Sequence, residues 1–356
     1  MKNRIDNLDL LRASAITLVV LFHLPSFVPW PEGPGLQLVQ GWWSGVDLFF
    51  VLSGYLVGGL FWSERVQRGQ VNAGVFILRR ALRTVPPYLI ALHLIYLSRW
   101  IAGAPIAYDW AYWIFLQNYT GMSLFSVSWS LCIEEHFYLV APFLMALVAR
   151  RERPWLLLLL LPVPLVSRLL FAEPGAGPFG PHYYSTHNHF EGLVLGVWLA
   201  YVRMHHSVTW DDVAKRLKPL LPPVVALVVG YQFLGIPQYA ENVLSYSAFA
   251  LAYGFILFEM VSLPALGISK SRLTKLIGRE AYSLYLTHSY VLLMFRQFVA
   301  PHLGSVPPMV QGLLALVAVI VGGHLFYLCV ERPVLALRDH LLSRWDDAHS
   351  RHVVAG

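Results

Sequence analysis

Long, largely apolar runs recur along the whole chain and constrain its fold more than any other feature. Four of them are residues 10–24, 46–62, 156–170 and 310–330. A helix needs about 20 apolar residues to cross the hydrocarbon core of a bilayer. Only 13% of the 356 residues are charged, against roughly 25% in a soluble globular domain. The sequence therefore predicts an all-α, polytopic bundle of transmembrane helices.

We expect about ten spans that form a single membrane domain over residues 1–356. The predicted spans are 9–28, 45–63, 85–102, 129–149, 154–171, 189–204, 219–235, 242–262, 281–300 and 308–331. Between the third and fourth spans, the aromatic stretch 106–120 is predicted to be interfacial or re-entrant, because Trp and Tyr gather at membrane–water interfaces.

The distribution of Lys and Arg between the loops predicts the orientation. Neither residue occurs in the loops around 29–44, 103–128, 172–188, 236–241 and 301–307. The alternate loops and both ends of the chain are basic, and cytoplasmic loops are enriched in Lys and Arg. We therefore expect both termini on the cytoplasmic side of the membrane. The formal charge of +6 forms no continuous basic stripe, so we predict no nucleic-acid binding.

Two ionisable residues of the first span share one helix face. Arg12 and His23 are separated by almost three helical turns, at about 3.6 residues per turn. An intramembrane ionisable side chain is costly, so each is a functional hypothesis. We predict His23 as a general base, since an alcohol must lose a proton as it attacks an acyl carbonyl. The alternatives are a structural histidine and, for Arg12, an anchor of the helix end.

Carboxylates lie at the start of two later spans. Asp47 opens the second span at a depth compatible with His23, where it either orients the imidazole or caps the helix N-terminus. Glu134 and Glu135 are adjacent near the start of the fourth span, which Trp129 opens. They lie about 100° apart on a helix, so at most one of them faces a narrow cavity, and the family resemblance described below favours Glu134. A partly buried carboxylate there tunes His23 or binds acceptor hydroxyls. We assign Trp129 to the acceptor as well.

Basic residues cluster before the third span, at Arg79, Arg80 and Arg83. Guanidinium groups bind phosphate oxygens in bidentate fashion. The cluster favours a site for the phosphates of a cytoplasmic, nucleotide-bearing donor such as coenzyme A. Positive-inside bias and contact with anionic lipid remain the alternatives.

Two further polar groups are candidate substrate contacts. Tyr282 and His288 lie in the ninth span, where they contact the pantetheine arm of the donor; a helix-bridging structural role is equally open for His288. His187, His189 and Glu191 follow one another in an outer loop and are candidate acceptor contacts. Their spacing is weak evidence for metal binding, so we predict no metal site.

Five blocks, in this order along the chain, resemble the integral-membrane acyltransferase 3 family. They are residues 8–23, 45–55, 79–83, 129–138 and 277–288. Members of that family move acetyl or longer acyl groups onto glycans, lipids and antibiotics. The resemblance implies about ten helices, an acyl-CoA donor bound from the inside and an acceptor reached from the outside.

Residue by residue, the resemblance implies functional positions. Arg12 and His23 match the family's essential pair, Arg80 and Arg83 match its arginine motif, and Glu134 matches its span-four glutamate.

The sequence also departs from the family pattern. His189 stands where many members have arginine, and His136 where many have glutamine, which leaves the acceptor contacts open. Some members carry a secreted hydrolase-like domain, and we expect this chain to be of the type without one.

The sequence therefore predicts a membrane O-acyltransferase, specifically an O-acetyltransferase. Acetyl-CoA is the expected co-substrate, and a hydroxyl of a cell-envelope, exported or lipid-linked glycan is the expected acceptor. His23 acts as the base, with a covalent acyl-histidine relay as a variant. A small-molecule natural product is the alternative acceptor. The rival class is a proton-coupled transporter, although no inverted repeat indicates one.

Overall fold

The computed structural model describes residues 6–121, 124–172, 179 and 181–354. Within these ranges the chain is helical and forms no strand, which confirms the all-α prediction. The longer helices are α1 (Asp6–His23), α3 (Gly45–Arg68), α4 (Ala73–Ile101), α6 (Trp129–Arg150), α7 (Pro162–Phe171), α9 (Glu191–His205), α10 (Ser207–Leu217), α11 (Leu221–Gly230), α13 (Tyr246–Ser262), α14 (Arg272–Arg279), α15 (Ala281–Met294), α16 (Pro308–Phe326) and α17 (Arg332–Val354). Shorter ones are α2 (Pro34–Gln40), α5 (Gln117–Thr120), α8 (Pro181–Tyr184) and α12 (Gln238–Ala240).

Seven helical segments in the described part of the chain are long and apolar enough to cross a membrane. They are Asp6–Ser26, Pro34–Arg68, Ser126–Arg150, Pro154–Phe171, Ser207–Leu234, Gln238–Ser262 and Pro308–Ser343. Each overlaps one of the ten predicted spans. The other three predicted spans coincide with α4, α9 and α15, of which α9 has only 15 residues, fewer than the ~20 of a typical crossing. The protein is thus an integral membrane protein.

The aromatic stretch 106–120 contains no long helix. It forms a single 3-10 turn at Trp110–Tyr112 and the short helix α5. Trp110 and Trp113 are exposed, whereas Tyr112 is buried and its hydroxyl accepts hydrogen bonds from the backbone of Leu124 and Phe125. The Tyr88 hydroxyl of α4 donates to the Tyr112 carbonyl oxygen at 2.9 Å, so the segment is fixed against the bundle and keeps tryptophan rings at its surface.

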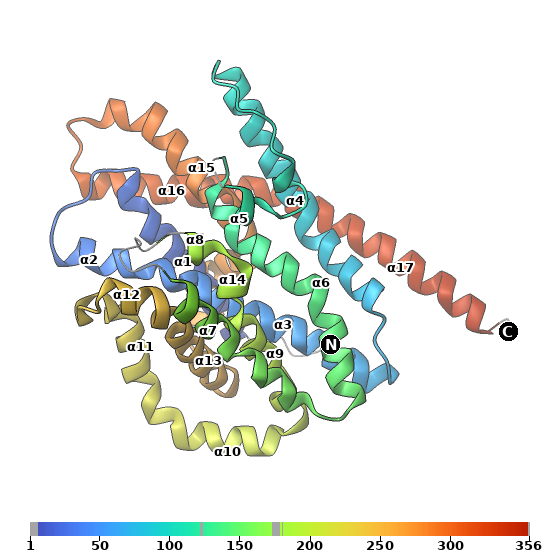
Figure 1. The fold of residues 1–356 in the computed structure, drawn as a ribbon. Helices are drawn as coiled ribbons and strands as arrows, with labels where there is room; N and C mark the ends of the chain where they lie inside the picture. Colours follow the sequence, from blue (N-terminus) through green and yellow to red (C-terminus); the bar gives the residue numbers. More distant parts are fainter. Residues whose placement is uncertain (1–5, 122–123, 173–178, 180, 355–356) are drawn as a thin grey trace.

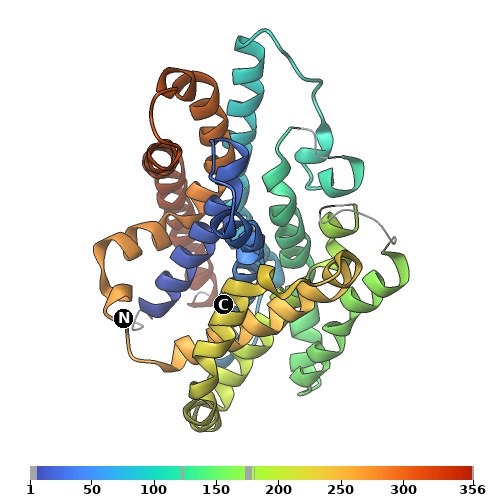
Figure 2. The ribbon, with the colours of Figure 1, turned by 90° about the vertical axis from the view of Figure 1, so that its left-hand side faces the viewer.

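Helices α1 and α3 occupy the centre of the bundle. Figure 2 shows them in blue, with the C-terminal helices in orange and red on one side and α6 and α7 in green on the other. Figure 1 shows α15 and α16 on one flank of this pair and α11 and α13 on the opposite flank. α3 packs against α1, α6, α9 and α13, so side chains from most of the bundle converge on it.

Glycines permit the closest helix contact, between α3 and α9. A Cβ added at Gly54 would lie 2.0 Å from the carbonyl oxygen of Leu193, and one at Gly196 would lie 2.2 Å from that of Val51. No side chain fits there, because the two backbones touch directly. The contact depends on small residues on both helices.

A second glycine contact fixes α14 against the start of α1. A Cβ at Gly278 would lie 2.4 Å from the carbonyl oxygen of Asp9. The neighbouring Asn7 side chain donates hydrogen bonds to the carbonyl oxygens of Met260 and Leu263, at 2.9 and 3.1 Å. The first turn of α1, which precedes Arg12, is therefore anchored on two sides.

We expect Gly54→Ala to destabilise the protein by about 1–3 kcal/mol, because overpacking forces the two backbones apart. The midpoint of thermal unfolding in detergent measures this. Gly59→Ala on the same helix is the matched control, since nothing lies within 4 Å of its added Cβ. Its midpoint should stay unchanged or rise, since alanine stabilises a helix by roughly 0.5–1 kcal/mol over glycine. Equal midpoints for G54A and G59A would contradict the contact.

Candidate active site

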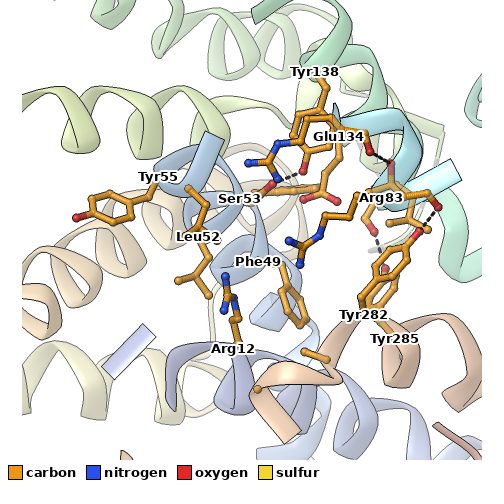
Figure 3. A pocket seen from close by; sticks show the side chains of 18 of the residues that line it. Arg12, Phe49, Leu52, Ser53, Tyr55, Arg83, Glu134, Tyr138, Tyr282 and Tyr285 are labelled. Carbon is orange, nitrogen blue, oxygen red and sulfur yellow. Dashed lines mark hydrogen bonds between the residues drawn. The ribbon is translucent and has the colours of Figure 1, made fainter. Parts of the chain in front are cut away.

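A cavity of about 480 Å³ opens between α1, α3, α4, α6, α14 and α15. Four arginines line it, and we call it the arginine cavity: Arg12, Arg80, Arg83 and Arg279. Glu134 is its lining carboxylate, and Ser53, Thr84, Ser130, Tyr138, Tyr282 and Tyr285 add hydroxyls. Figure 3 shows the side chains of Arg12, Arg83 and Glu134 directed into the same space. Its size is that of a typical ligand pocket. Arg12 and Arg279 have carboxylate partners, Asp9 at 3.2 Å and Glu280 at 2.7 Å, so Arg80 and Arg83 are the cations of the lining best placed to bind an anion.

Helix α4 brings two of these arginines to the cavity. The helix begins where the side chain of Asn72 accepts a hydrogen bond from the Val75 amide at 3.1 Å, a common N-cap arrangement. Two turns later, the Arg80 guanidinium lies over the Tyr138 ring, 5.8 Å from its centroid. The Tyr138 hydroxyl in turn hydrogen-bonds with Ser53 of α3. Aromatic and hydroxyl contacts thus hold this wall of the cavity together.

Hydrogen bonds also join α4 to α6 and α15. The Thr84 hydroxyl donates to Glu135 at 2.5 Å, and the Tyr282 hydroxyl donates to the Thr84 carbonyl oxygen at 2.6 Å. Glu135 therefore points to α4, while its neighbour Glu134 lines the cavity. Adjacent residues lie about 100° apart around a helix, so the two carboxylates point in different directions.

Arg79 lies outside the arginine cavity. Its guanidinium is 3.6 Å from the Glu64 carboxylate, and both residues line an adjoining cavity of about 210 Å³, which shares Arg80 with the arginine cavity. Of the three arginines predicted to bind a donor, the structure brings Arg80 and Arg83 to the larger cavity and turns Arg79 away from it.

His23 lines a second cavity, of about 150 Å³, which we call the histidine cavity. Its walls are mainly aromatic, with Phe22, Trp43, Trp129, Phe179, Tyr183, Tyr184 and Tyr285 among them. The Nδ1 atom of His23 lies 2.8 Å from the Val19 carbonyl oxygen. A carbonyl only accepts, so Nδ1 carries the proton, and Nε2 of the neutral ring keeps a lone pair. The imidazole therefore has the tautomer that a general base at Nε2 requires.

His288 lies beside His23 and lines neither of these cavities. The two rings are 4.9 Å apart between centroids. His288 is fully buried, and its Nδ1 is 2.7 Å from the Tyr285 carbonyl oxygen. No partner for its Nε2 occurs among the described residues. The structure thus places His288 against the predicted base, His23. Tyr282 of the same helix lines the arginine cavity.

Asp47 pairs with His189, and not with His23 as the carboxylate-partner hypothesis required. Asp47 Oδ1 lies 2.8 Å from His189 Nε2, and both side chains are buried. His189 also packs against Trp129 and Tyr183, with ring centroids 5.3 and 5.2 Å away. The pair therefore lies behind the aromatic wall of the histidine cavity.

Arg168, Glu191 and Ser247 form a second buried charged group next to this pair. The Arg168 guanidinium is fully buried and donates to Glu191 Oε1 at 2.8 Å and to Ser247 Oγ at 2.6 Å. It also donates to the Val243 and Asn188 carbonyl oxygens. Glu191 is thereby neutralised inside the bundle. These groups fix α7, α9 and α13 to one another.

The predicted acceptor residues therefore separate in space. Trp129 lines the histidine cavity, whereas His189 and Glu191 are buried and hydrogen-bonded to Asp47 and Arg168. His187 is exposed, and its ring stacks 6.2 Å from that of Tyr119. The sequence reasoning assigned no site role to three residues that matter in the structure. Arg279 and Tyr285 line the arginine cavity, and Arg168 holds Glu191 in the buried network. Arg168 alone carried a usable signal, because an arginine inside an apolar span is as costly as His23.

The described part of the chain contains no group of three or more His, Cys, Asp or Glu residues arranged to hold a metal ion.

A bundle of membrane helices with an arginine-lined cavity next to a half-buried histidine fits an integral-membrane enzyme. The chain belongs to the acyltransferase 3 family: the family model described as "Acyltransferase domain" matches residues 5–328.

Curated relatives are named as O-acetyltransferases. The chain is 26% identical to "O-acetyltransferase OatA" of Staphylococcus aureus (strain NCTC 8325 / PS 47), over 93% of this chain and 57% of that protein. It is 26% identical to "Peptidoglycan O-acetyltransferase OatA" of Listeria monocytogenes, over 93% of this chain and 56% of that protein. The chain thus spans little more than half the length of these relatives. No solved structure matches it.

Replacing Arg168 by alanine should destabilise the protein strongly, by about 3–5 kcal/mol, because Glu191 then stays buried without its cation. We expect a large fall in the thermal midpoint, or loss of the monodisperse peak in size-exclusion chromatography. The control is Lys215→Ala, which removes an exposed 3.7 Å pair with Asp212 worth about 0–1 kcal/mol. A wild-type midpoint for R168A would show that the buried network does not hold the helices together.

Proposed function

We propose that the protein is a membrane O-acetyltransferase that moves an acetyl group from cytoplasmic acetyl-CoA to a hydroxyl of a cell-envelope glycan. The observation that carries this proposal is the arginine cavity beside His23, in a chain of the acyltransferase family. We also infer that α4, α9 and α15 complete ten crossings. With the basic loops inside, both termini then lie in the cytoplasm of a bacterial inner membrane.

The arginine cavity is the proposed donor site. Coenzyme A carries a diphosphate and a ribose phosphate, and guanidinium groups pair with such oxygens in bidentate fashion. Arg80 and Arg83, supported by Arg12 and Arg279, provide that charge. Glu134 stands among them and balances part of it. Tyr282 lies on the same wall, where the pantetheine arm passes toward His23.

His23 is the proposed general base. Its Nε2 lone pair takes the proton of the acceptor hydroxyl while the hydroxyl oxygen attacks the thioester carbonyl carbon. The new C–O bond forms, the C–S bond breaks, and the coenzyme A thiolate leaves with the electron pair. Holding both reactants against one imidazole supplies much of the rate enhancement. His288 is fully buried against His23, so its proposed role is to position the imidazole and not to contact the donor.

The histidine cavity is the proposed acceptor site. Aromatic rings provide flat apolar surfaces that suit the C–H faces of a sugar, and Trp43, Trp129 and Tyr183 line the cavity with His23. The name of the Listeria relative includes peptidoglycan, which supports a glycan as the acceptor. Asp47 and His189 support this wall from behind, and His187 contacts the glycan at the exposed edge.

Acetyl transfer should be lost when His23 is replaced by alanine. General-base catalysis contributes typically about 10²–10⁴-fold, so we expect a fall of that size in labelling of purified peptidoglycan from radiolabelled acetyl-CoA. His302→Ala, at an exposed histidine, is the control for a lost imidazole. Wild-type labelling by H23A would eliminate the base assignment. Uptake of a solute with protons, without labelling by the wild type, would identify a transporter instead.

Donor affinity should depend on Arg80 and Arg83 more than on Arg79. Loss of a charge-assisted hydrogen bond costs roughly tenfold or more in binding, so R80A and R83A should raise the KM for acetyl-CoA by at least that factor. Arg79→Ala should raise it less, because Arg79 pairs with Glu64 outside the cavity. Steady-state coenzyme A release provides the measurement. A larger effect at Arg79 than at Arg83 would contradict the donor site.

A further inference from the structure

One described residue lines both the arginine cavity and the histidine cavity, and that residue is Tyr285. Its ring lies between the proposed phosphate-binding arginines and the proposed base. It is labelled at the edge of the cavity in Figure 3. The donor and acceptor compartments therefore meet at a single tyrosine side chain.

Two hydrogen bonds hold the Tyr285 side chain in this position. Its hydroxyl donates to the Val127 carbonyl oxygen at 2.8 Å and lies 2.6 Å from Ser130 Oγ. Because the phenol has one proton, the Ser130 hydroxyl is the donor in the second bond. Val127 lines the histidine cavity and Ser130 lines the arginine cavity. The phenol thus ties the two linings together.

Aromatic contacts support the ring from both directions. Phe49, which lines the arginine cavity, is 5.8 Å from Tyr285 between centroids, and His288, the neighbour of His23, is 5.7 Å away. Only 6% of Tyr285 is exposed. The side chain is therefore a packed wall between the compartments.

Acyl transfer requires that this wall be crossed, since the thioester carbon must meet a hydroxyl held at His23. Water is also a hydroxyl, and a thioester left open beside a base and water is hydrolysed. Enzymes suppress such side reactions by keeping water from the reacting groups. A residue at the boundary can therefore decide how much acetyl is lost to water.

We propose that Tyr285 is a positioning residue that closes the passage between the two cavities and limits hydrolysis of the donor. Movement of its side chain, with loss of the Val127 and Ser130 hydrogen bonds, admits the acetyl thioester to His23. This inference rests on the proposed function. In this role Tyr285 controls whether water or the acceptor hydroxyl receives the acetyl group. It takes no part in binding the phosphates.

Coenzyme A release from acetyl-CoA, with water as the only acceptor, tests this role in the purified protein. In the balanced reaction, the water oxygen bonds to the acetyl carbon, His23 takes the proton, and the C–S bond breaks to give acetate and coenzyme A. Tyr285→Phe keeps the ring and removes the hydroxyl. We expect release to rise about tenfold, the effect of two lost hydrogen bonds of ordinary strength. Tyr285→Ala should raise it further.

Three controls make the result specific. Tyr290→Phe changes a tyrosine of the same helix that lines neither cavity, and its release rate should equal that of the wild type. His23→Ala combined with Tyr285→Phe should return release to the low rate, because the leak uses the same base. Binding of radiolabelled acetyl-CoA to Y285F should match the wild type, which shows a folded donor site.

The outcomes separate this inference from the proposed function. Wild-type transfer to peptidoglycan with unchanged water-dependent release in Y285F and Y285A overturns the role of Tyr285 alone. A rise in coenzyme A release that persists when His23→Ala is combined with Tyr285→Phe overturns the role of Tyr285 as well. Absence of any acetyl transfer by the wild type overturns the proposed function and this inference with it.

Discussion

The direct backbone contact between α3 and α9 is the constraint on which the rest of the structure depends. Gly54 and Gly196 leave no room for a side chain there, so these helices have one relative position. α3 carries Ser53 into the arginine cavity and Asp47 to His189, whereas α9 begins at Glu191, the partner of Arg168. The contact therefore sets the distance between the cavity and the buried charges behind it.

Buried charges occur in two arrangements with different consequences. Arg168 with Glu191, and His189 with Asp47, are matched pairs in which one carboxylate oxygen is hydrogen-bonded to the partner side chain. The arginine cavity instead gathers four guanidiniums, of which Arg12 and Arg279 pair with Asp9 and Glu280. Arg80 and Arg83 leave positive charge for an anion. Matched pairs of this kind fix helices, and an excess of one sign in a cavity indicates ligand binding.

Much of this arrangement follows from the sequence, because hydropathy and helical periodicity act locally. The apolar runs predict the helices, and residue spacing with family resemblance predicts Arg12, Arg80, Arg83, Glu134 and Tyr282, which line one cavity. Pairing between distant segments is not local. Asp47 and His189 are matched only by tertiary packing, and Tyr285 stands out only once two cavities exist on either side of it. The direction of Glu135 likewise depends on tertiary packing, because its hydrogen bond with Thr84 holds it toward α4.

The position of Arg168 also bears on how the chain is inserted during synthesis. Every described group that its guanidinium bonds, from Asn188 to Ser247, is translated after it. Until then the Pro154–Phe171 segment carries an arginine without these partners, which is costly inside a membrane. The full set of Arg168 hydrogen bonds can form only after residues up to Ser247 have been translated. The final packing of α7 is therefore coupled to the synthesis of α9 and α13.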